Sequence, residues 1–567
     1  MIDVEHDACG VGFLYSPCNS HTIIEDALTA LANVEHRGAS GHDGISGDGA
    51  GVMFALPWQF FANTAGWKTD SSHGLQAVGV VFMPASKVAV SQRLIEESAM
   101  HLNLQICAWR EVPINRQVLG ESAISACPAV YQFKVEVLST LTTAQFDSKL
   151  IYLRKCILRE SLANSELVNL SIVSLSAHTI VYKALTQGAQ LPEFYPDLND
   201  PRLESNWAIF HRRFCTNTTS RWALAQPFSS IAHNGEINSL LGNRNWLKVR
   251  EAGLPEELLP LFDQTASDSS NLNDALEMYI HNGYHIDEAL MVLLPEPYKE
   301  HPLAHRNPEI ATFYEYHAAF QEPWDGPALI VYSDGLKLGA AMDRNGLRPC
   351  RYAVMKDGGV FLCSEMGALE FAEEKVLRRG RLGPGQMLSI DLISGRISFN
   401  AELKSLTADR QPYSEWLYRT RRKLDTRIGG VESVLSDERL QTLQKAMGYS
   451  REDLEFYVGE MSELGHEPIF SMGDDTPIAV LSSQPRPLFD YFKQRFAQVT
   501  NPPIDHLRER VVMSLDVYLG DRKPLAYGES PMRKILHLPS PIIDGSQMSA
   551  IVNHENFPSV KIDMTFV

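Results

Sequence analysis

The sequence lacks the usual signatures of metal, nucleotide and membrane proteins. Its eight cysteines include no CxxC pair and no cysteine–histidine cluster with zinc or iron–sulfur spacing. P-loop, HExxH and strand-following GxGxxG motifs are missing as well. The apolar runs, such as residues 289–294, are far shorter than the roughly 20 residues that cross a bilayer. We therefore expect no membrane partner, and mostly buried thiols in a reducing compartment.

Positive charge is also scarce. Lys and Arg total 51 against 69 Asp and Glu among 567 residues, so the formal net charge is −18. Because nucleic-acid binding needs a basic face, this composition argues against nucleic acid as a partner. Residues 1–8 carry three acids and no Lys or Arg, so they lack the basic and apolar parts of a secretory signal. The sequence predicts a soluble, cytoplasmic protein.

What the chain does contain is ordinary globular sequence, 44% apolar and 21% charged. Short strand-like segments alternate with helical ones up to about residue 400, which favours a layered α+β fold. Between residues 404 and 437 the composition shifts to charged, helix-favouring sequence, and helices are expected to about residue 520. Apolar residues alternate again over 560–566, which predicts a terminal strand that needs a continuation or a partner.

Two of the candidate functional residues lie on predicted strands. Alternation over residues 9–15 predicts a strand that begins at Cys9, followed by a helix over 22–34. A Cys-Gly pair near a terminus is more often structural than catalytic. Arg213 shares one face of an apolar alternating run, residues 207–215, where a buried guanidinium needs an anion. That anion is either a ligand or an internal salt-bridge partner.

Two further candidates have equally plain structural interpretations. Asn234-Gly235 follows a short apolar run, and Asn-Gly is a common hairpin turn. Asp268 precedes a predicted amphipathic helix, where an acidic residue commonly caps the helix. Taken separately, these residues decide nothing about function.

Taken together, the motifs resemble one family. ACGVGF, ANVEHRGA, SGDGAGV, RRFCTNTTSRWALAQPF, IAHNGEINSLLGNRNW, SDSSNLNDALE and AAMDRNGLRPCRY occur in this order. The set resembles the glutaminase domain of the class II glutamine amidotransferases, and specifically the amino-terminal part of the glutamate synthase large subunit. A later segment that begins SMGDDTPIAVLSSQPRPLFDYF resembles the opening of the central domain of that family.

The resemblance implies a fold and a division of the chain. We expect an α+β fold, namely the four-layer αββα sandwich of N-terminal-nucleophile hydrolases, over residues 9–405. Residues 1–8 would be a propeptide, residues 406–436 a helical connector, and residues 437–567 an incomplete central domain.

The resemblance also implies how glutamine would be hydrolysed. Cleavage after Ala8 would give Cys9 a free α-amine, whose pKa of about 7.7 to 8.0 lets it accept the thiol proton. Cys9 would then attack the side-chain amide of L-glutamine, and a thioester would form as ammonia leaves. Asn234, through its side-chain NH2, and Gly235, through its backbone N–H, match the oxyanion hole of the family.

Other matched residues would bind the substrate or support the nucleophile. Arg213 matches the residue that grips the α-carboxylate, and Asp268 the one that holds the α-ammonium. Three residues near the nucleophile would support it without a direct chemical role: His36, Arg37 and Gly38. One position departs from the family pattern, because Cys215 stands where a serine is usual.

In the family, ammonia passes to a synthase domain that uses FMN and an iron–sulfur cluster to aminate 2-oxoglutarate reductively. These residues show no cysteine trio and no flavin-binding segment, so we expect no cofactor in this chain. The synthase domain would lie on a continuation or a separate chain, served by ferredoxin or an electron-donating subunit.

Two other functions stay open at this point. One is a catalytically silent glutamine-binding or scaffold module whose N-terminus is never processed. The other is an N-terminal-cysteine amide hydrolase that acts on unrelated amides. The Arg213 and Asp268 pair argues against the second, because a simple amide has no α-carboxylate or α-ammonium to bind.

Overall fold

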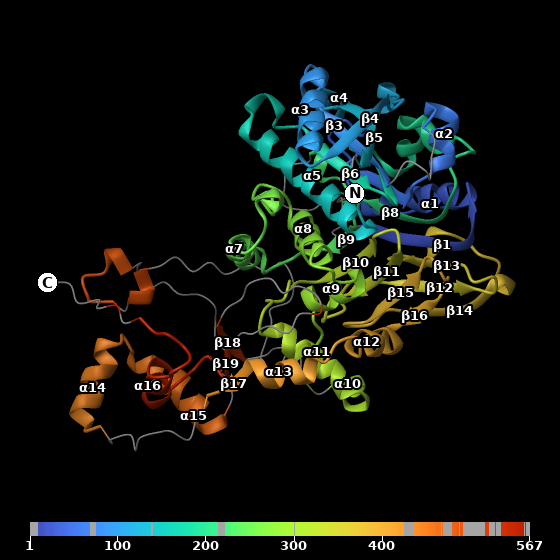
Figure 1. The fold of residues 1–567 in the computed structure, drawn as a ribbon. Coiled ribbons are helices and arrows are strands. Elements are labelled where there is room, and N and C mark those ends of the chain that lie inside the picture. Colours follow the sequence, from blue (N-terminus) through green and yellow to red (C-terminus); the bar gives the residue numbers. More distant parts are fainter. Residues whose placement is uncertain are drawn as a thin grey trace. The chain divides into compact units, whose positions relative to one another are not determined.

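The computed structural model describes residues 9–67, 75–137, 140–213, 221–299, 301–424, 435–465, 468, 479–486, 488–491, 516–520, 528, 534–560 and 562. The chain divides into two compact units (Figure 1). The first comprises residues 1–420 and 521–535, and the second residues 421–520 and 536–567.

A seven-stranded antiparallel sheet lies at the centre of the first unit. Its strands, in order across the sheet, are β14 (Val376–Arg381), β12 (Arg351–Met355), β13 (Val360–Cys363), β1 (Gly10–Ser20), β8 (Ser205–Arg212), β2 (Ala50–Ala55) and β7 (Thr179–Ala184). β1 begins directly after Cys9, as the alternation predicts. The strand that carries the candidate nucleophile therefore lies inside the sheet, between β13 and β8.

A second antiparallel sheet has five strands. In order they are β16 (Ile397–Phe399), β15 (Met387–Asp391), β11 (Lys337–Met342), β10 (Ala328–Ser333) and β9 (Ile231–Gly235). The two sheets share one apolar core, in which Val11 and Phe13 of β1 pack with Val331 of β10 and Leu338 of β11. All four side chains are fully buried. Burial of this apolar surface holds the two sheets face to face.

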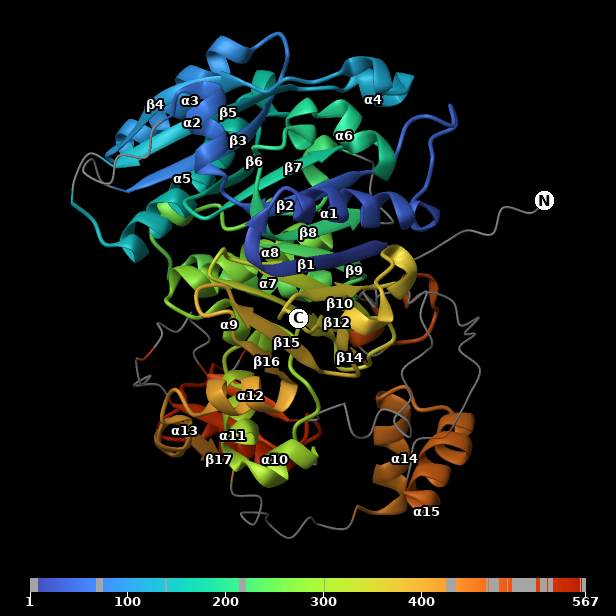
Figure 2. The ribbon, with the colours of Figure 1, turned by 90° about the vertical axis from the view of Figure 1, so that its right-hand side faces the viewer.

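Helices cover both outer faces of this pair of sheets. α1 (Thr22–Asn33) packs on β1 and β8 of the seven-stranded sheet, close to the predicted helix bounds. On the other side, α8 (Asp268–His281), α9 (Ile286–Leu293) and α12 (Asn400–Ala408) pack on β9, β11 and β15. Figure 2 shows α1 beside β1 and β8, with α12 beyond β15 and β16. The order helix, sheet, sheet, helix confirms the predicted α+β, αββα architecture.

A smaller αβ layer flanks the sandwich. Its sheet has the order β4 (Leu104–Glu111), β5 (Ala129–Val137), β3 (Gln76–Met83) and β6 (Ser171–Ser176). Helices α3 (Val88–His101) and α5 (Thr143–Ala163) pack over it and contribute to a separate apolar core. The remaining helices of the first unit are α2 (Trp58–Ala65), α4 (Glu121–Ser125), α6 (Leu191–Phe194), α7 (Leu240–Glu251), α10 (Pro302–Arg306), α11 (Pro308–Ala318) and α13 (Tyr413–Thr420).

The second unit has a small core. Strands β17 (Arg421–Lys423), β19 (Ile535–Leu538) and β18 (Val517–Gly520) form a three-stranded sheet. Its helices are α14 (Asp437–Ala446), a π-helical turn (Asp453–Gly459), α15 (Glu460–Leu464) and α16 (Gly545–Val552). The strand predicted over 560–566 is wrong for its two described residues, Val560 and Ile562, which are exposed and in no strand. The rest of that segment lies outside the described residues.

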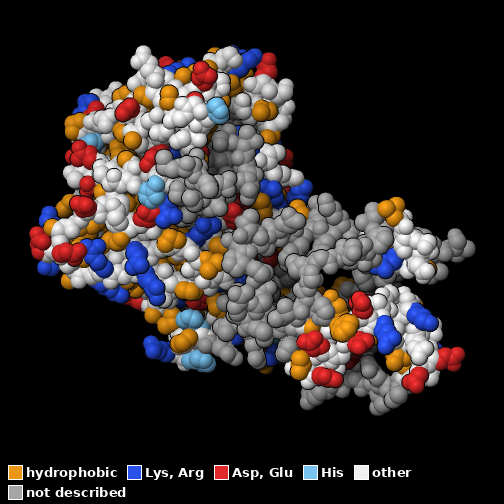
Figure 3. All heavy atoms as spheres, turned by 180° about the vertical axis from the view of Figure 1, so that it is seen from behind, with side chains coloured by type: hydrophobic (Ala, Val, Ile, Leu, Met, Phe, Trp, Pro, Cys, Tyr) orange, Lys and Arg blue, Asp and Glu red, His pale blue; other side chains and the backbone are white. Residues whose placement is uncertain are grey.

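The described surface carries side chains of both charges. Basic and acidic side chains are both spread over the face of the first unit seen in Figure 3. Among the described helices, none has the length and apolar character needed to cross a membrane.

Candidate functional site

Cys9 lies in the interior of the first unit, at the start of β1. Its backbone carbonyl accepts a hydrogen bond of 2.8 Å from the side-chain Nδ2 of Asn234. Burial raises the pKa of the Cys9 thiol to about 11, although the positive charges of Arg213 and Arg348 act to lower it. In the chain that begins at Met1, the Cys9 thiol is protonated at neutral pH. It therefore needs a base before it can act as a nucleophile.

Asn234 and Gly235 end β9, whose partner strand β10 begins at Ala328. The hairpin interpretation of Asn-Gly is therefore wrong, because the neighbouring strand is distant in sequence. Asn234 is buried, and within the described part of the chain its Oδ1 has no hydrogen-bond partner. Gly235 has φ of +142°, and a Cβ there would lie 1.8 Å from the carbonyl oxygen of Pro327. Only glycine fits this backbone position next to Asn234.

Arg213 departs from the predicted strand pattern. β8 ends at Arg212, and Arg213 has a positive φ of +94°, a conformation that costs an arginine about 1–3 kcal/mol. Its N–H donates to the carbonyl of Gly49 at 2.9 Å, and its Nε lies 3.5 Å from Oδ2 of Asp48. The positive charge of its guanidinium acts to lower the pKa of the Cys9 thiol.

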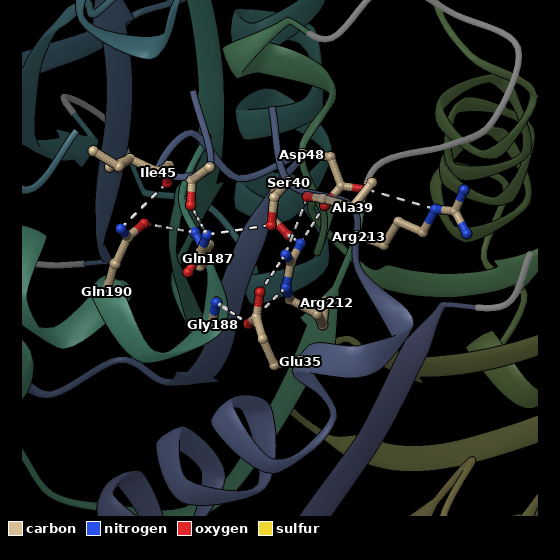
Figure 4. A network of polar contacts seen from close by, with 12 residues as sticks. Glu35, Ala39, Ser40, Ile45, Asp48, Gln187, Gly188, Gln190, Arg212 and Arg213 are labelled. Atoms are coloured by element: carbon tan, nitrogen blue, oxygen red, sulfur yellow. Dashed lines mark hydrogen bonds and ion pairs between the residues drawn. The ribbon is translucent and has the colours of Figure 1, made fainter. Parts of the chain in front are cut away.

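The structure records an ion pair with Asp48 for Arg213, but the fully buried ion-pair network belongs to its neighbour, Arg212. This side chain is fully buried, and its Nε and Nη2 donate to the carboxylate of Glu35 at 2.9 and 2.6 Å. Its Nη1 also donates to Asp48. Figure 4 shows Arg212 between Glu35 and Asp48, with Arg213 extending to the far side of Asp48. The adjacent arginines thus share one carboxylate but have different surroundings.

The turn formed by His36, Arg37 and Gly38 lies against residues at or just after the ends of β8 and β13, the strands that flank β1. The Nε2 of His36 lies 2.9 Å from both carboxylate oxygens of Glu365, and Arg37 Nε donates to the same group. Although burial acts to raise it, the pKa of Glu365 is lowered by Arg37 and His36. At Gly38 a Cβ would lie 2.0 Å from Cζ of Arg212. The contacts recorded for this turn are therefore with Glu365, just after β13, and with Arg212 at the end of β8, and not with the Cys9 thiol itself.

Asp268 is the first residue of α8, but the residue that caps the helix is Ser267, whose Oγ accepts the N–H of Ser270. The N-cap interpretation of Asp268 is therefore wrong by one residue. The carboxylate of Asp268 is buried and accepts the N–H of Ser269 at 2.6 Å on Oδ1. Its Oδ2 accepts the N–H of Ile237 at 2.9 Å. These donors hold the carboxylate at the helix N-terminus.

Two charged residues that act on the Cys9 thiol were not among the site residues predicted from the sequence. Asp48 acts to raise and Arg348 to lower the pKa of Cys9. Both lie in motifs that resemble the family, SGDGAGV and AAMDRNGLRPCRY, and those motifs are the sequence signal for them. Cys215 and the propeptide, residues 1–8, lie outside the described residues.

The structure thus brings four other predicted site residues into the neighbourhood of Cys9. Asn234 contacts Cys9 directly, Gly235 follows Asn234, and the charges of Arg213 and Asp268 both act on the Cys9 thiol. Among the described residues, no three His, Cys, Asp or Glu side chains are grouped to hold a metal ion, and the seven described cysteines are free thiols.

Two family models match the sequence. The model of class II glutamine amidotransferases matches residues 9–416, and that of the glutamate synthase central domain matches residues 442–567. The first match begins at Cys9 and includes every predicted site residue.

Similar curated proteins are longer than this chain. "Ferredoxin-dependent glutamate synthase 2" from Synechocystis sp. is 43% identical over 96% of this chain and 36% of its own length. "Ferredoxin-dependent glutamate synthase, chloroplastic" from Spinacia oleracea is 42% identical over 97% of this chain and 35% of its own length. The chain thus spans about a third of the length of these relatives.

Solved structures give a weaker match. The structure of "the allosteric regulatory enzyme of purine biosynthesis" is 12% identical, with a TM-score of 0.32, over 69% of this chain and 48% of that chain. The family model, in contrast, covers residues 9–416 without relying on that likeness. On that match, this chain belongs to the class II glutamine amidotransferases.

Proposed function

We propose that this chain hydrolyses L-glutamine to glutamate and ammonia, with Cys9 as the nucleophile, as the amidotransferase part of a glutamate synthase. The observation that carries the proposal is the contact between Asn234 Nδ2 and the Cys9 carbonyl, because it sets an amide donor beside the buried thiol. Membership of the amidotransferase family and the names of the relatives support it.

Maturation supplies the missing base. Cleavage after Ala8 converts the amide nitrogen of Cys9 into an amine with an ordinary pKa of about 7.7 to 8.0. The amine takes the thiol proton, which burial otherwise holds on the sulfur. The thiolate then attacks the amide carbon of glutamine, and the carbonyl electron pair moves to the oxygen.

The resulting oxyanion is stabilised by the end of β9. Asn234 Nδ2 and the Gly235 N–H are the two donors, and each typically lowers the barrier by about 2.7–4 kcal/mol. The α-ammonium of Cys9 returns its proton to the leaving nitrogen, so ammonia departs and a thioester remains. Water then attacks the thioester and releases glutamate.

Opposite charges select the substrate. Arg213 binds the α-carboxylate of glutamine with its planar fork, and Asp268 binds the α-ammonium. This assignment is supported by the way both charges act on the Cys9 thiol, since the site must hold both ends of one small molecule. A bare amide would leave both charged groups unpaired, which disfavours its binding.

The ammonia serves a reductive amination of 2-oxoglutarate on a synthase portion of the enzyme. FMN and an iron–sulfur cluster belong to that portion, which lies on a continuation or a partner chain, with ferredoxin or an electron-donating subunit as reductant. The names of the ferredoxin-dependent relatives support this assignment. We place the enzyme in the cytoplasm, consistent with its free thiols.

The division of the chain follows the same logic. Residues 9–405 form the glutaminase domain, 406–436 a connector and 437–567 an incomplete central domain. The matched ranges 9–416 and 442–567 support this division.

An ammonia-release assay tests the function. The processed chain should convert L-glutamine into equal amounts of glutamate and ammonia, and Cys9→Ala should abolish the reaction. Cys18→Ala is the matched control, because Cys18 is an exposed thiol at the far end of β1. Glutamine binding without ammonia release, in a chain that still begins at Met1, would instead favour the silent binding module.

A further inference from the structure

A buried histidine connects the end of β9 to the substrate-binding carboxylate. His233 immediately precedes Asn234, and its ring Nδ1 lies 2.7 Å from Oγ of Ser269. The backbone of His233 is fixed on both sides: its N–H donates to Gln226 Oε1 at 2.6 Å, and its carbonyl accepts from His211 Nε2 at 2.9 Å. Two backbone hydrogen bonds and one ring hydrogen bond therefore fix the position of the His233 imidazole.

The hydrogen bonds determine which atoms carry protons. The Asp268 carboxylate accepts backbone N–H groups on both oxygens, so the Ser269 hydroxyl, 3.0 Å from Asp268 Oδ1, donates to it. The Ser269 oxygen must then accept from His233, which places the imidazole proton on Nδ1. Burial lowers the pKa of His233 to about 4, so the ring is neutral at working pH, and within the described part of the chain its Nε2 has no hydrogen-bond partner.

We propose that His233 and Ser269 are positioning residues that set the distance between the two ends of the glutamine site. His233 and the oxyanion donor Asn234 are consecutive on β9, and Ser269 and the ammonium-binding Asp268 are consecutive on α8. The hydrogen bonds from His233 to Ser269 and from Ser269 to Asp268 therefore connect the oxyanion hole to the ammonium subsite. This inference rests on the proposed function and explains how the site selects an amide with an α-ammonium at the glutamine distance.

The test compares L-glutamine with glutaramate, the analogue that lacks the α-ammonium. Ser269→Ala should lower kcat/KM for L-glutamine about tenfold, mainly through KM, because Asp268 loses a donor and its alignment. The value for glutaramate should stay nearly constant, so the ratio of the two falls about tenfold. His233→Leu should act in the same direction.

Conservative variants and a neighbour provide controls. Ser269→Thr keeps the hydroxyl, and His233→Asn places an amide N–H near the position of Nδ1, so both should restore the ratio. Ser270→Ala, on the next residue of α8, should leave it unchanged. An equal loss for both substrates in Ser269→Ala, with a lowered urea midpoint, would show a merely structural role and overturn the inference.

A binding experiment separates this inference from the proposed function. If the wild-type chain releases no ammonia, the proposed function fails, and the inference is then tested with L-glutamate and glutarate, a pair that differs only in the α-ammonium. By calorimetry, the wild type should prefer L-glutamate, and Ser269→Ala should reduce that preference about tenfold. No preference in the wild type, or an unchanged preference in the variant, would contradict the inference.

Discussion

At the scale of single residues, two arginines that are adjacent in the sequence have different environments. Arg212 is fully buried and bonded to Glu35 and Asp48, whereas Arg213 adopts a positive φ and acts on Cys9. The alternating pattern placed Arg213 on the apolar face of the strand, whereas the structure buries Arg212 and ends the strand there. The pattern could not show that the strand ends between the two, because that break depends on a backbone conformation that arginine rarely adopts.

We predict that the two arginines respond differently to substitution. Arg213→Lys should raise KM for L-glutamine at least tenfold with little change in melting temperature, since lysine cannot form the two parallel bonds to a carboxylate. Arg212→Ala should lower the free energy of unfolding by about 3–5 kcal/mol, because it leaves carboxylates without their buried partner. Kinetics and urea denaturation of both variants check this, and equal destabilisation by both would show that Arg213 is also a structural ion-pair residue.

A second prediction concerns the thiol before maturation. Because burial raises the pKa of Cys9 to about 11, the thiolate fraction at pH 8 is about one thousandth in a chain that retains residues 1–8. Its alkylation by iodoacetamide should rise about tenfold per pH unit up to that value. The rate is measured by mass spectrometry of the Cys9 peptide, and a plateau near pH 8 would contradict the account.

At the scale of elements, the hydrophobic periodicity predicted individual strands and helices but not how distant strands pair. The strand that begins at Cys9 and the helix that follows it were predicted, and the structure confirms both. The pairing of β9 with β10 was not predictable, because no short-range signal connects Asn234-Gly235 to a strand that begins at Ala328. The local turn signal of Asn-Gly gave the wrong structure for the same reason. The resemblance to the family, not the pattern, suggested the function of this pair.

Gly235 tests whether the end of β9 is as tightly constrained as the geometry indicates. Gly235→Ala should destabilise the protein by more than 1 kcal/mol and remove most activity, because the new Cβ would collide with the Pro327 carbonyl at a positive φ. Gly242→Ala is the matched control: this helical glycine of α7 has open space, so alanine should stabilise by about 0.5–1 kcal/mol. Urea midpoints measure both, and tolerance of alanine at position 235 would contradict the assigned backbone.

At the scale of the whole molecule, the composition predicts a change to charged, helix-favouring sequence between residues 404 and 437. The described helices of residues 437–464 bury no side chain, and apolar residues such as Leu443, Phe456 and Met461 are exposed. Helical periodicity predicts such segments without specifying what packs against them. In the first unit, the paired sheets bury their apolar faces against each other, which is why the layered fold could be anticipated from composition and pattern.

Buried histidines make the stability of the molecule depend on pH. Burial lowers the pKa of His317 on α11 to about 4, from an ordinary value of about 6.5. The unfolded state therefore binds one more proton than the folded state between these pH values, and stability falls as the pH falls through that window. His317→Asn should reduce the slope of unfolding free energy by up to about 1.4 kcal/mol per pH unit. Urea denaturation at pH 4.5 to 7 measures the slope, and an unchanged slope would contradict the assignment.

The central claim is that Cys9, once freed at its N-terminus, is the glutamine-directed nucleophile. The most direct measurement is the intact mass and N-terminal sequence of the chain after incubation with a diazoketone analogue of L-glutamine. We expect a chain that begins at Cys9 and carries one adduct on its sulfur, formed with loss of dinitrogen. A chain that still begins at Met1, or a processed chain without the adduct, would contradict the account.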